Sequence, residues 1–480
     1  MDVTTSGPGT SPSPVRDWAL VAAMTAAAHP AALGLGLVAL GVLAIFRDVV
    51  FPATLSLPVL VVTAIAAATH RPRFPGHPIR PADEPELAAL VRQVAERLGF
   101  RAPLLVRVTP QPDAGTVLAR ASGARTCVLL LGLPLLRRLT AAELAAVVAH
   151  EIAHQQRNRD RRTSLLLGAR ESLVESLDHR FRAPAAVAER LLRASQARSW
   201  SAELAGDADA AAVAGTAAVR RALAQLGPMS AAFHLLGEEW AAVLGEDGAY
   251  PDDLYEALDA ALGDPHVARR MAAAAERDEV DPMAAASHPP PAIRLAALPE
   301  HPGFGWDDSR PVALRDADAL RRRCVRDLVG SEADPDDLRP VRVLDAAPER
   351  FEGALREAGA QLAEVTGQDS VRRAVAVAAD TVADGSWLRL ARALDPEIGR
   401  LPPPVRTEAG RDVLVASLGR ALSGVLLQAG WARASRWTAA VLVNPAGELI
   451  DVADLVEQAV NGNPAQLRAL LSATGEPAVP

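Results

Sequence analysis

Two histidines and a glutamate stand close together in the stretch AAVVAHEIAHQQRNRD, residues 145–160. On an α-helix, His150 and His154 are one turn apart and point the same way, which suits two neighbouring ligands of a zinc ion. Glu151 lies about 100° further round the helix, from where it can reach a metal-bound water without itself binding the metal. The H-E-x-x-H spacing therefore predicts a hydrolytic zinc site in which Glu151 acts as the general base.

The sequence around this motif favours a buried helix. Thr140, followed three residues later by Glu143, forms a capping box, which marks a helix start. An apolar stripe at helical spacing follows and would bury the helix against a core. The alternative is two polar residues on the solvated face of an ordinary helix, but buried histidines without partners are costly. The stripe consists of Leu144, Val147, Val148 and Ile152.

A zinc hydrolase needs a third protein ligand and an open fourth position. The stretch SWSAELAGDADAAAVAG, residues 199–215, is rich in alanine and compatible with a helix. Its Glu203 could complete a ligand set of two histidines and a glutamate. Asp207, one turn further on, could accept a hydrogen bond from the free ring nitrogen of a ligand histidine. On spacing alone, a solvated acidic helix face is an equal alternative.

These motifs, in this order, resemble the membrane-associated zinc metallopeptidases of the HtpX and CAAX-prenyl-protease type. The resemblance extends over roughly residues 80–300 and is carried first by VLLLGLPLLRRLTAAELAAVVAHEIAHQQRNRD, residues 128–160. Ser199 and the residues after it follow the register of that family's third ligand. A later segment, SHPPPAIRLAAL, residues 287–298, is similar to the family's third motif. The zinc ligands that the resemblance implies are His150, His154 and Glu203.

The third motif adds two candidate residues by the same resemblance. His288 would stabilise the oxyanion that forms during peptide hydrolysis. Arg294 would anchor the loop or a substrate carbonyl. Alternatively, His288 and Pro289 only start a helix, and Arg294 pairs with a surface acid. The resemblance thus implies catalytic roles for Glu151, His288 and Arg294.

Besides Ala292, which stands where the family often has glutamate, the sequence departs from the family pattern at two places. Gly206 stands where the family usually has alanine, which is a minor change. In TPQPDAGTVLA, residues 109–119, the residues from Asp113 to Gly115 replace a run similar to Asn-Ala-Phe-Ala. That run lies near an edge strand with which extended substrates pair. The departure bears on substrate preference rather than on the metal site.

The N-terminal segment differs in composition from the rest of the chain. Residues 1–15 are rich in Ser, Thr, Pro and Gly and are expected to be disordered. Residues 18–46 and 49–69 carry almost no charge, and each run is long enough to cross a bilayer of about 30 Å. We therefore expect two transmembrane helices within residues 16–70. Two buried core helices are the alternative.

Two features of this segment bear on its topology. His29-Pro30 interrupts the first span, so the helix either kinks there or begins near Pro30, which leaves residues 18–28 at the interface. Arginines are more frequent after the second span than in the hairpin loop, and the positive-inside rule then places both chain ends in the cytoplasm. We expect a multi-pass protein of the cytoplasmic membrane whose catalytic domain faces the cytoplasm. The arginines are Arg71, Arg73 and Arg80.

The composition of the whole chain excludes some classes of partner. The chain has 480 residues and a formal net charge of −8, which argues against a nucleic-acid partner. It contains no lysine and abundant Ala, Gly and Pro, which indicates the codon bias of a high-GC bacterium. Cys127 and Cys324 are far apart in the sequence, so we expect two reduced thiols and no disulfide.

Residues 310–480 lie beyond the resemblance and are mostly helical by pattern. The exception is residues 437–452, where two short strands are expected around an Asn-Pro-Ala-Gly turn. The segment shows no catalytic constellation, phosphate loop or metal cluster. We expect a C-terminal domain that binds or docks a partner, which the sequence does not identify.

The sequence thus predicts an α+β, mostly helical protein. An N-terminal transmembrane helical hairpin would precede a zincin-type metalloprotease domain, residues 80–302, with a small sheet and the H-E-x-x-H helix. The expected activity is that of a membrane-anchored zinc endopeptidase acting on membrane or membrane-proximal proteins. One alternative is a catalytically silent membrane adaptor, although a scaffold would not need Glu151. Another is an enzyme gated by its C-terminal domain.

Overall fold

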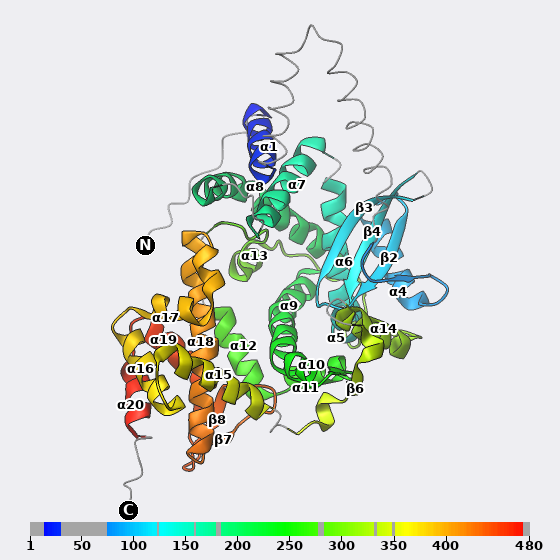
Figure 1. Ribbon diagram of the computed structural model, residues 1–480. Coiled ribbons are helices and arrows are strands. Elements are labelled where there is room, and N and C mark those ends of the chain that lie inside the picture. The colour runs from blue at the N-terminus through cyan, green and yellow to red at the C-terminus, as the bar shows by residue number, and fades with distance from the viewer. Residues whose placement is uncertain are drawn as a thin grey trace, which may run out of the picture.

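The chain folds into a mostly helical α+β protein with small sheets, as the sequence predicts (Figure 1). The sheet that accompanies the H-E-x-x-H helix lies on one side of the molecule, and the C-terminal helices gather on the other. The computed structural model describes residues 14–29, 74–121, 124–157, 160–178, 184–276, 283–330, 334–347 and 351–473.

A four-stranded sheet lies beside the H-E-x-x-H helix. Its strand order is β1-β2-β4-β3, with β2 parallel to β4 and the two outer pairs antiparallel. The central strand β4 is apolar, and its residues Cys127, Val128 and Leu129 are fully buried. Among the described strands β3 lies at an edge, as predicted for this part of the chain. The strands are β1 (His77–Ile79), β2 (Leu104–Thr109), β3 (Ala114–Ala121) and β4 (Ala124–Gly132).

The H-E-x-x-H helix, α6 (Ala141–Arg157), is buried along most of its length. Its start is the predicted capping box. The backbone N–H of Thr140 donates to Glu143 Oε2 at 3.0 Å, and the N–H of Glu143 donates to Thr140 Oγ1 at 3.3 Å. Glu143 also accepts a hydrogen bond from Arg221 of α9 (Thr216–Leu236) at 3.0 Å. The capping box therefore fixes both the first turn of α6 and the helix beside it.

Helix α8 (Ala185–Ala214) packs along α6 and carries the second motif. Gly215 separates α8 from α9 and has a φ of 93°, which glycine adopts without strain. A Cβ at this position would lie 2.7 Å from Gly303 Cα, so glycine also permits the close passage of another chain segment. The hydroxyl of Thr216 donates to the Pro299 carbonyl at 2.6 Å. The α8–α9 junction thus holds the segment that follows the third motif.

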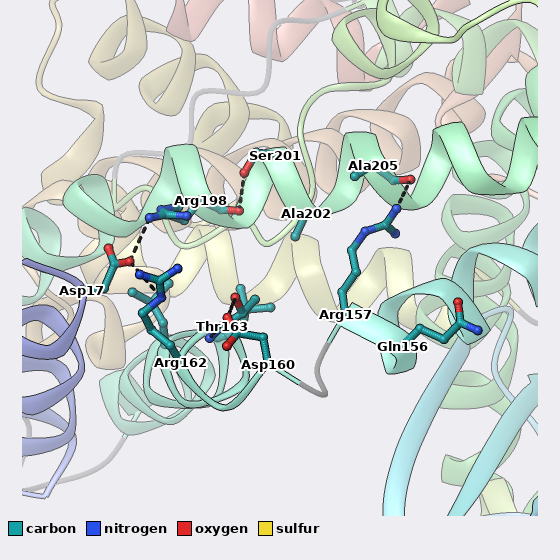
Figure 2. Close-up of a pocket in the computed structure, with 12 residues that line it drawn as sticks. Asp17, Gln156, Arg157, Asp160, Arg162, Thr163, Arg198, Ser201, Ala202 and Ala205 are labelled. Carbon is teal, nitrogen blue, oxygen red and sulfur yellow. Dashed lines mark hydrogen bonds and ion pairs between the residues drawn. The ribbon is translucent and has the colours of Figure 1, made fainter. Parts of the chain in front are cut away.

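Helix α1 (Pro14–Ala28) packs against α7 (Arg161–Glu175) and α8. Asp17 is buried, and its carboxylate lies 2.8 Å from Arg198 Nη2 and 3.5 Å from Arg162 Nε (Figure 2). These three residues help to line a pocket of about 480 Å³ between α6, α7 and α8. The buried carboxylate and its two arginines fix α1 to α7 and α8.

The structure of the N-terminal segment differs from the sequence prediction in two respects. Helix α1 begins at Pro14, so the last two residues of the segment expected to be disordered are helical. It ends at Ala28, just before the predicted interruption, and its residues pack on the domain. In the described part of the chain, no helix combines the length and the apolar character that crossing a bilayer requires. Residues 1–13 and most of the two predicted spans, including all of 49–69, lie outside the described residues.

Two apolar cores organise most of the described helices. The first surrounds the sheet and α6 and includes Cys324, Val343 and Trp437, which lie beyond the segment of family resemblance. The second is built from helices that follow residue 351. A shared apolar core does not by itself mark where one domain ends and the next begins. The predicted domain limits, with a C-terminal domain from residue 310, therefore stay a prediction.

The C-terminal segment contains the predicted hairpin. Strands β8 (Val441–Val443) and β9 (Leu449–Asp451) pair antiparallel around the Asn-Pro-Ala-Gly turn. The Asn444 side chain stabilises the turn, because its Oδ1 accepts the backbone N–H groups of Ala446 and Glu448 at 2.9 Å each. The sequence prediction for this element is confirmed.

The other elements complete the two cores. Helices α16, α19 and α20 lie on the side of the molecule opposite the four-stranded sheet (Figure 1). These elements are α4 (Pro85–Arg97), α5 (Leu133–Arg138), α10 (Ala242–Glu246), α11 (Leu254–Leu262), α12 (Pro265–Glu276), α13 (Pro291–Ala297), α14 (Ala317–Val329), α15 (Phe351–Thr366), α16 (Val371–Ala383), α17 (Trp387–Leu394), α18 (Pro403–Gln428), α19 (Val452–Val460), α20 (Ala465–Ala473), β5 (Ala249–Pro251), β6 (Arg339–Val341) and β7 (Ala432–Arg433).

Candidate metal centre and active site

Three side chains from two helices converge on one point. His150 Nε2 lies 2.9 Å from His154 Nε2 and 3.5 Å from Glu203 Oε2, and His154 Nε2 lies 3.1 Å from Glu203 Oε1. Around a tetrahedral zinc ion with ligand bonds near 2 Å, the ligand atoms would be about 3.3 Å apart. The three observed distances lie on either side of that value. The residues present therefore fit a metal ion, and this group could hold one.

A glycine lets the two helices approach closely at this point. A Cβ at Gly206 of α8 would lie 3.1 Å from ring atoms of both His150 and His154, which is tighter than an ordinary carbon contact. Gly206 therefore allows α8 to lie directly against the two imidazole rings. From the sequence alone this departure from the family is expected to be minor, whereas in the structure Gly206 lies against the rings of both candidate ligands.

Hydrogen bonds within the cluster shift the pKa values of His150 and Glu203. Burial disfavours the charged form of His150, but hydrogen bonds to Asp207 and Glu203 outweigh it and raise the pKa of His150 to about 9. Burial likewise disfavours ionised Glu203, but the surrounding histidines hold the pKa of Glu203 far below its usual range. The ionised carboxylates of Glu203 and Asp207 therefore favour a cation at this point.

Behind the ligands, Asp207 connects His150 to the third motif. Its Oδ1 lies 2.9 Å from His150 Nδ1, the ring nitrogen that faces away from the ligand cluster. Arg294 donates to both carboxylate oxygens of Asp207, from Nε at 2.8 Å and from Nη2 at 2.6 Å. Burial would raise the pKa of Asp207, but Arg294 and His150 lower it to about 2. The partner of Arg294 is thus a buried acid beside the ligands and not a surface acid.

His288 is the other third-motif residue and lies at the open side of the cluster. Its Nδ1 contacts Glu203 Oε2, and its side chain is 57 % exposed. It stands three residues before the first residue of α13. The structure thus brings His288 to the ligand cluster through Glu203, while its role as an oxyanion donor stays a prediction.

The H-E-x-x-H helix is joined to the edge strand by side-chain hydrogen bonds. Gln155 Nε2 donates to Thr116 Oγ1 at 2.9 Å and to the Thr116 carbonyl at 3.3 Å. Thr116 Oγ1 in turn donates to the Glu151 carbonyl at 3.5 Å. Glu151 itself is partly exposed beside the ligands. These contacts fix β3 relative to the general-base candidate.

The sequence does not predict the contact between Gln155 and Thr116. Gln155 directly follows the candidate ligand His154, which marks it as close to the site, but its partner Thr116 lies 39 residues away. Asp113, the carboxylate that departs from the family pattern, is exposed just before β3 and accepts a hydrogen bond from Thr109 at 3.2 Å. Its effect on substrate preference stays a prediction.

Comparison with known proteins agrees with this site. Residues 81–301 match the family model described as peptidase family M48. The matched segment contains all three motifs, from the start of α4 to the end of the third motif. No solved structure was found to match the chain. Residues 81–301 are thus similar to peptidase family M48, which agrees with the resemblance of the sequence to HtpX- and CAAX-protease-like metallopeptidases.

Proposed function

We propose that this chain is a membrane-anchored endopeptidase whose zinc ion is held by His150, His154 and Glu203. The observation that carries the proposal is the convergence of the three ligand atoms at separations that suit a tetrahedral metal. Two imidazoles and one carboxylate suit Zn²⁺ better than Mg²⁺ or Ca²⁺, which prefer oxygen ligands. The match of residues 81–301 to the model of peptidase family M48 supports the metallopeptidase class.

The side chains of the site have separate tasks in peptide hydrolysis. A bound zinc ion would supply Lewis acidity and lower the pKa of a water toward about 7. Glu151 accepts a proton from the attacking water and passes it to the departing amine. His288 donates a hydrogen bond to the oxyanion that develops from the scissile carbonyl. The edge strand β3 offers backbone groups with which an extended peptide can pair.

The N-terminal segment supports attachment to a membrane. Val15 and Trp18 are 77 % and 46 % exposed on α1, although both are apolar. The chain that follows α1 carries almost no charge up to residue 69. Tryptophan is favoured at membrane interfaces. We therefore place the protein in the cytoplasmic membrane, with the catalytic domain in the cytoplasm and substrates in or near the bilayer.

The test is replacement of the proposed base. Glu151→Gln should retain about one zinc per chain and the wild-type melting temperature, because Glu151 is not a ligand. Hydrolysis of a fluorogenic casein should fall by at least about 10²-fold, because the variant cannot accept the proton. Glu357→Gln, an exposed change on α15, is the matched control and should hydrolyse casein at the wild-type rate.

Three results would count against the proposal. Wild-type turnover by Glu151→Gln would refute the mechanism. Zinc retained in full after His150→Ala combined with Glu203→Ala would refute the ligand set. Wild-type protein that binds zinc but cleaves neither casein nor any protein trapped by Glu151→Gln would favour the adaptor alternative.

A further inference from the structure

A buried arginine outside the metal site holds the loop that leads to His288. Arg170 of α7 is 3 % exposed. Its Nη1 donates to the Leu192 carbonyl at 2.7 Å and to Ser195 Oγ at 2.8 Å, both on α8. Its Nη2 donates to the Ala286 carbonyl at 3.0 Å and also to that of Ala284. One guanidinium therefore connects α7, α8 and the loop before the third motif.

The loop makes further contacts that restrict its path. Ser199 Oγ of α8 donates to the Ser287 carbonyl at 3.0 Å. Met283 and Ala284 are buried in a small apolar cluster with residues of α1, α7 and α8. Ala284 has a φ of 54°, in the left-handed region that non-glycine residues rarely adopt because it is sterically unfavourable. Its hydrogen bond to Arg170 helps to stabilise this conformation. The next residue after Ser287 is His288.

The energetics indicate why an arginine stands at this position. The neighbouring side chains in the cluster, such as Leu166 and Leu173, are apolar. A methionine could fill a similar volume without the desolvation cost of burying a cation. The planar guanidinium offers five N–H groups in fixed directions, which suits several carbonyls that must be held at once. What Arg170 adds beyond packing is therefore the position of the loop.

We propose that Arg170 is a positioning residue for His288. By holding the carbonyls of Ala284 and Ala286, together with Ser199 at the next carbonyl, it keeps His288 beside Glu203. The proposal rests on the proposed function, because it assumes that His288 assists peptide hydrolysis. It assigns to α7, which contributes no candidate ligand, a specific part in catalysis.

The first test is a double-mutant cycle between Arg170 and His288. Arg170→Met should lower kcat by up to about 10²-fold, as His288→Ala does, with nearly unchanged KM and zinc content. Combining the two should lower kcat no further than His288→Ala alone, because both remove the same donor. Arg170→Lys keeps the charge but not the planar fork, so its kcat should lie between those of the wild type and Arg170→Met.

The second test does not depend on activity. Met283→Cys places a thiol in the loop where the methionine is 2 % exposed. Cys127 and Cys324 are buried, and burial raises the pKa of their thiols to about 11 and about 12, so they should remain silent toward maleimide. Adding Arg170→Met should accelerate labelling at position 283 by about tenfold or more, because the loop is released. Leu166→Cys, in the same cluster on α7, is the matched control and should stay protected.

Several outcomes would overturn the proposal. Losses in kcat that multiply in the double variant would mean that Arg170 acts independently of His288. Equal labelling at position 283 with and without Arg170 would mean that the arginine does not hold the loop. Labelling of Leu166→Cys as well would assign Arg170 a general folding role. If Arg170→Met does not fold, Ser199→Ala replaces it in both tests, with smaller effects in the same direction.

The two tests also separate this proposal from the proposed function. A wild-type protein without hydrolytic activity would refute the function, while the labelling experiment would still decide whether Arg170 holds the loop.

Discussion

The carboxylate of Asp207 stands between the candidate metal ligands and the third motif. It contacts His150 on one side and receives the forked hydrogen bond of Arg294 on the other. It is only 2 % exposed, so neither contact competes with bulk water. The orientation of the His150 ring therefore depends on a residue that touches no metal.

Replacing Asp207 should weaken metal binding without removing a ligand. Asp207→Ala should lower zinc affinity by about 10–100-fold, because His150 loses the group that orients its ring. Competition with a chromophoric chelator measures the affinity. Asp209→Ala is the matched control, since Asp209 lies on the same helix but pairs with Arg157 and is more exposed. Equal losses in the two variants would contradict the role assigned to Asp207.

At the residue scale, the sequence predicts which residues form the site better than it predicts the contacts between them. The spacing of His150 and His154 specifies their common helix face, because helical geometry is local. The pairing of Arg294 with Asp207 joins residues 87 positions apart and depends on how α13 meets α8. Arg170 carries no recognisable motif at all, so its contacts with the loop emerge only from the tertiary structure.

At the element scale, the start of α6 is set by the capping box. Thr140→Ala removes the hydroxyl that accepts the N–H of Glu143, and the free energy of unfolding should fall by about 1 kcal/mol. The melting temperature should fall by about 2–4 °C, with unchanged zinc content. Thr381→Ala on α16 is the control, because the hydroxyl of Thr381 bonds to a carbonyl within its own helix. A similar loss in both variants would argue against a specific cap.

The sequence predicts the elements that have strong local signals, but it does not predict the elements against which they pack. The capping box and the hairpin around Asn444 follow from local patterns, whereas the edge position of β3 was implied by the family resemblance. Helix α1 shows the limit of this approach. A run of alanine, valine and leucine has the same pattern whether it faces lipid or protein, and the contacts of Asp17 with two arginines decide that α1 packs on α7 and α8.

At the scale of the whole molecule, the peptidase part depends on residues far beyond the family match. Trp437 is 3 % exposed and belongs to the first core. The neighbouring Arg436 donates to the carbonyls of Val343 and Ala346 at 2.7 and 3.0 Å. Arg270 of α12 likewise contacts Asp451 at 2.9 Å. The C-terminal chain thus contributes to the packing of the first core, which includes α6.

Loss of Trp437 should therefore destabilise the metal-binding part of the protein. Trp437→Ala should cost about 3–5 kcal/mol, because it leaves a large cavity in the first core. Thermal unfolding with and without a chelator identifies the transition that depends on metal, and this transition should shift to lower temperature. Trp387→Ala, beside the second core, is the control. If Trp437→Ala shifted only the transition that is insensitive to chelator, the first core would not extend this far along the chain.

Helix α18 connects the second core to the apolar cluster that contains Met283. Its 26 residues form a rod about 39 Å long. Leu414, Leu418 and Leu422 anchor the rod in the second core, while Val405 near its start packs against the cluster that contains Met283. A stiff rod embedded at one end transmits tilt to the other. A tilt of the C-terminal helices would therefore move Val405 against the cluster that holds Met283, at the start of the loop that carries His288.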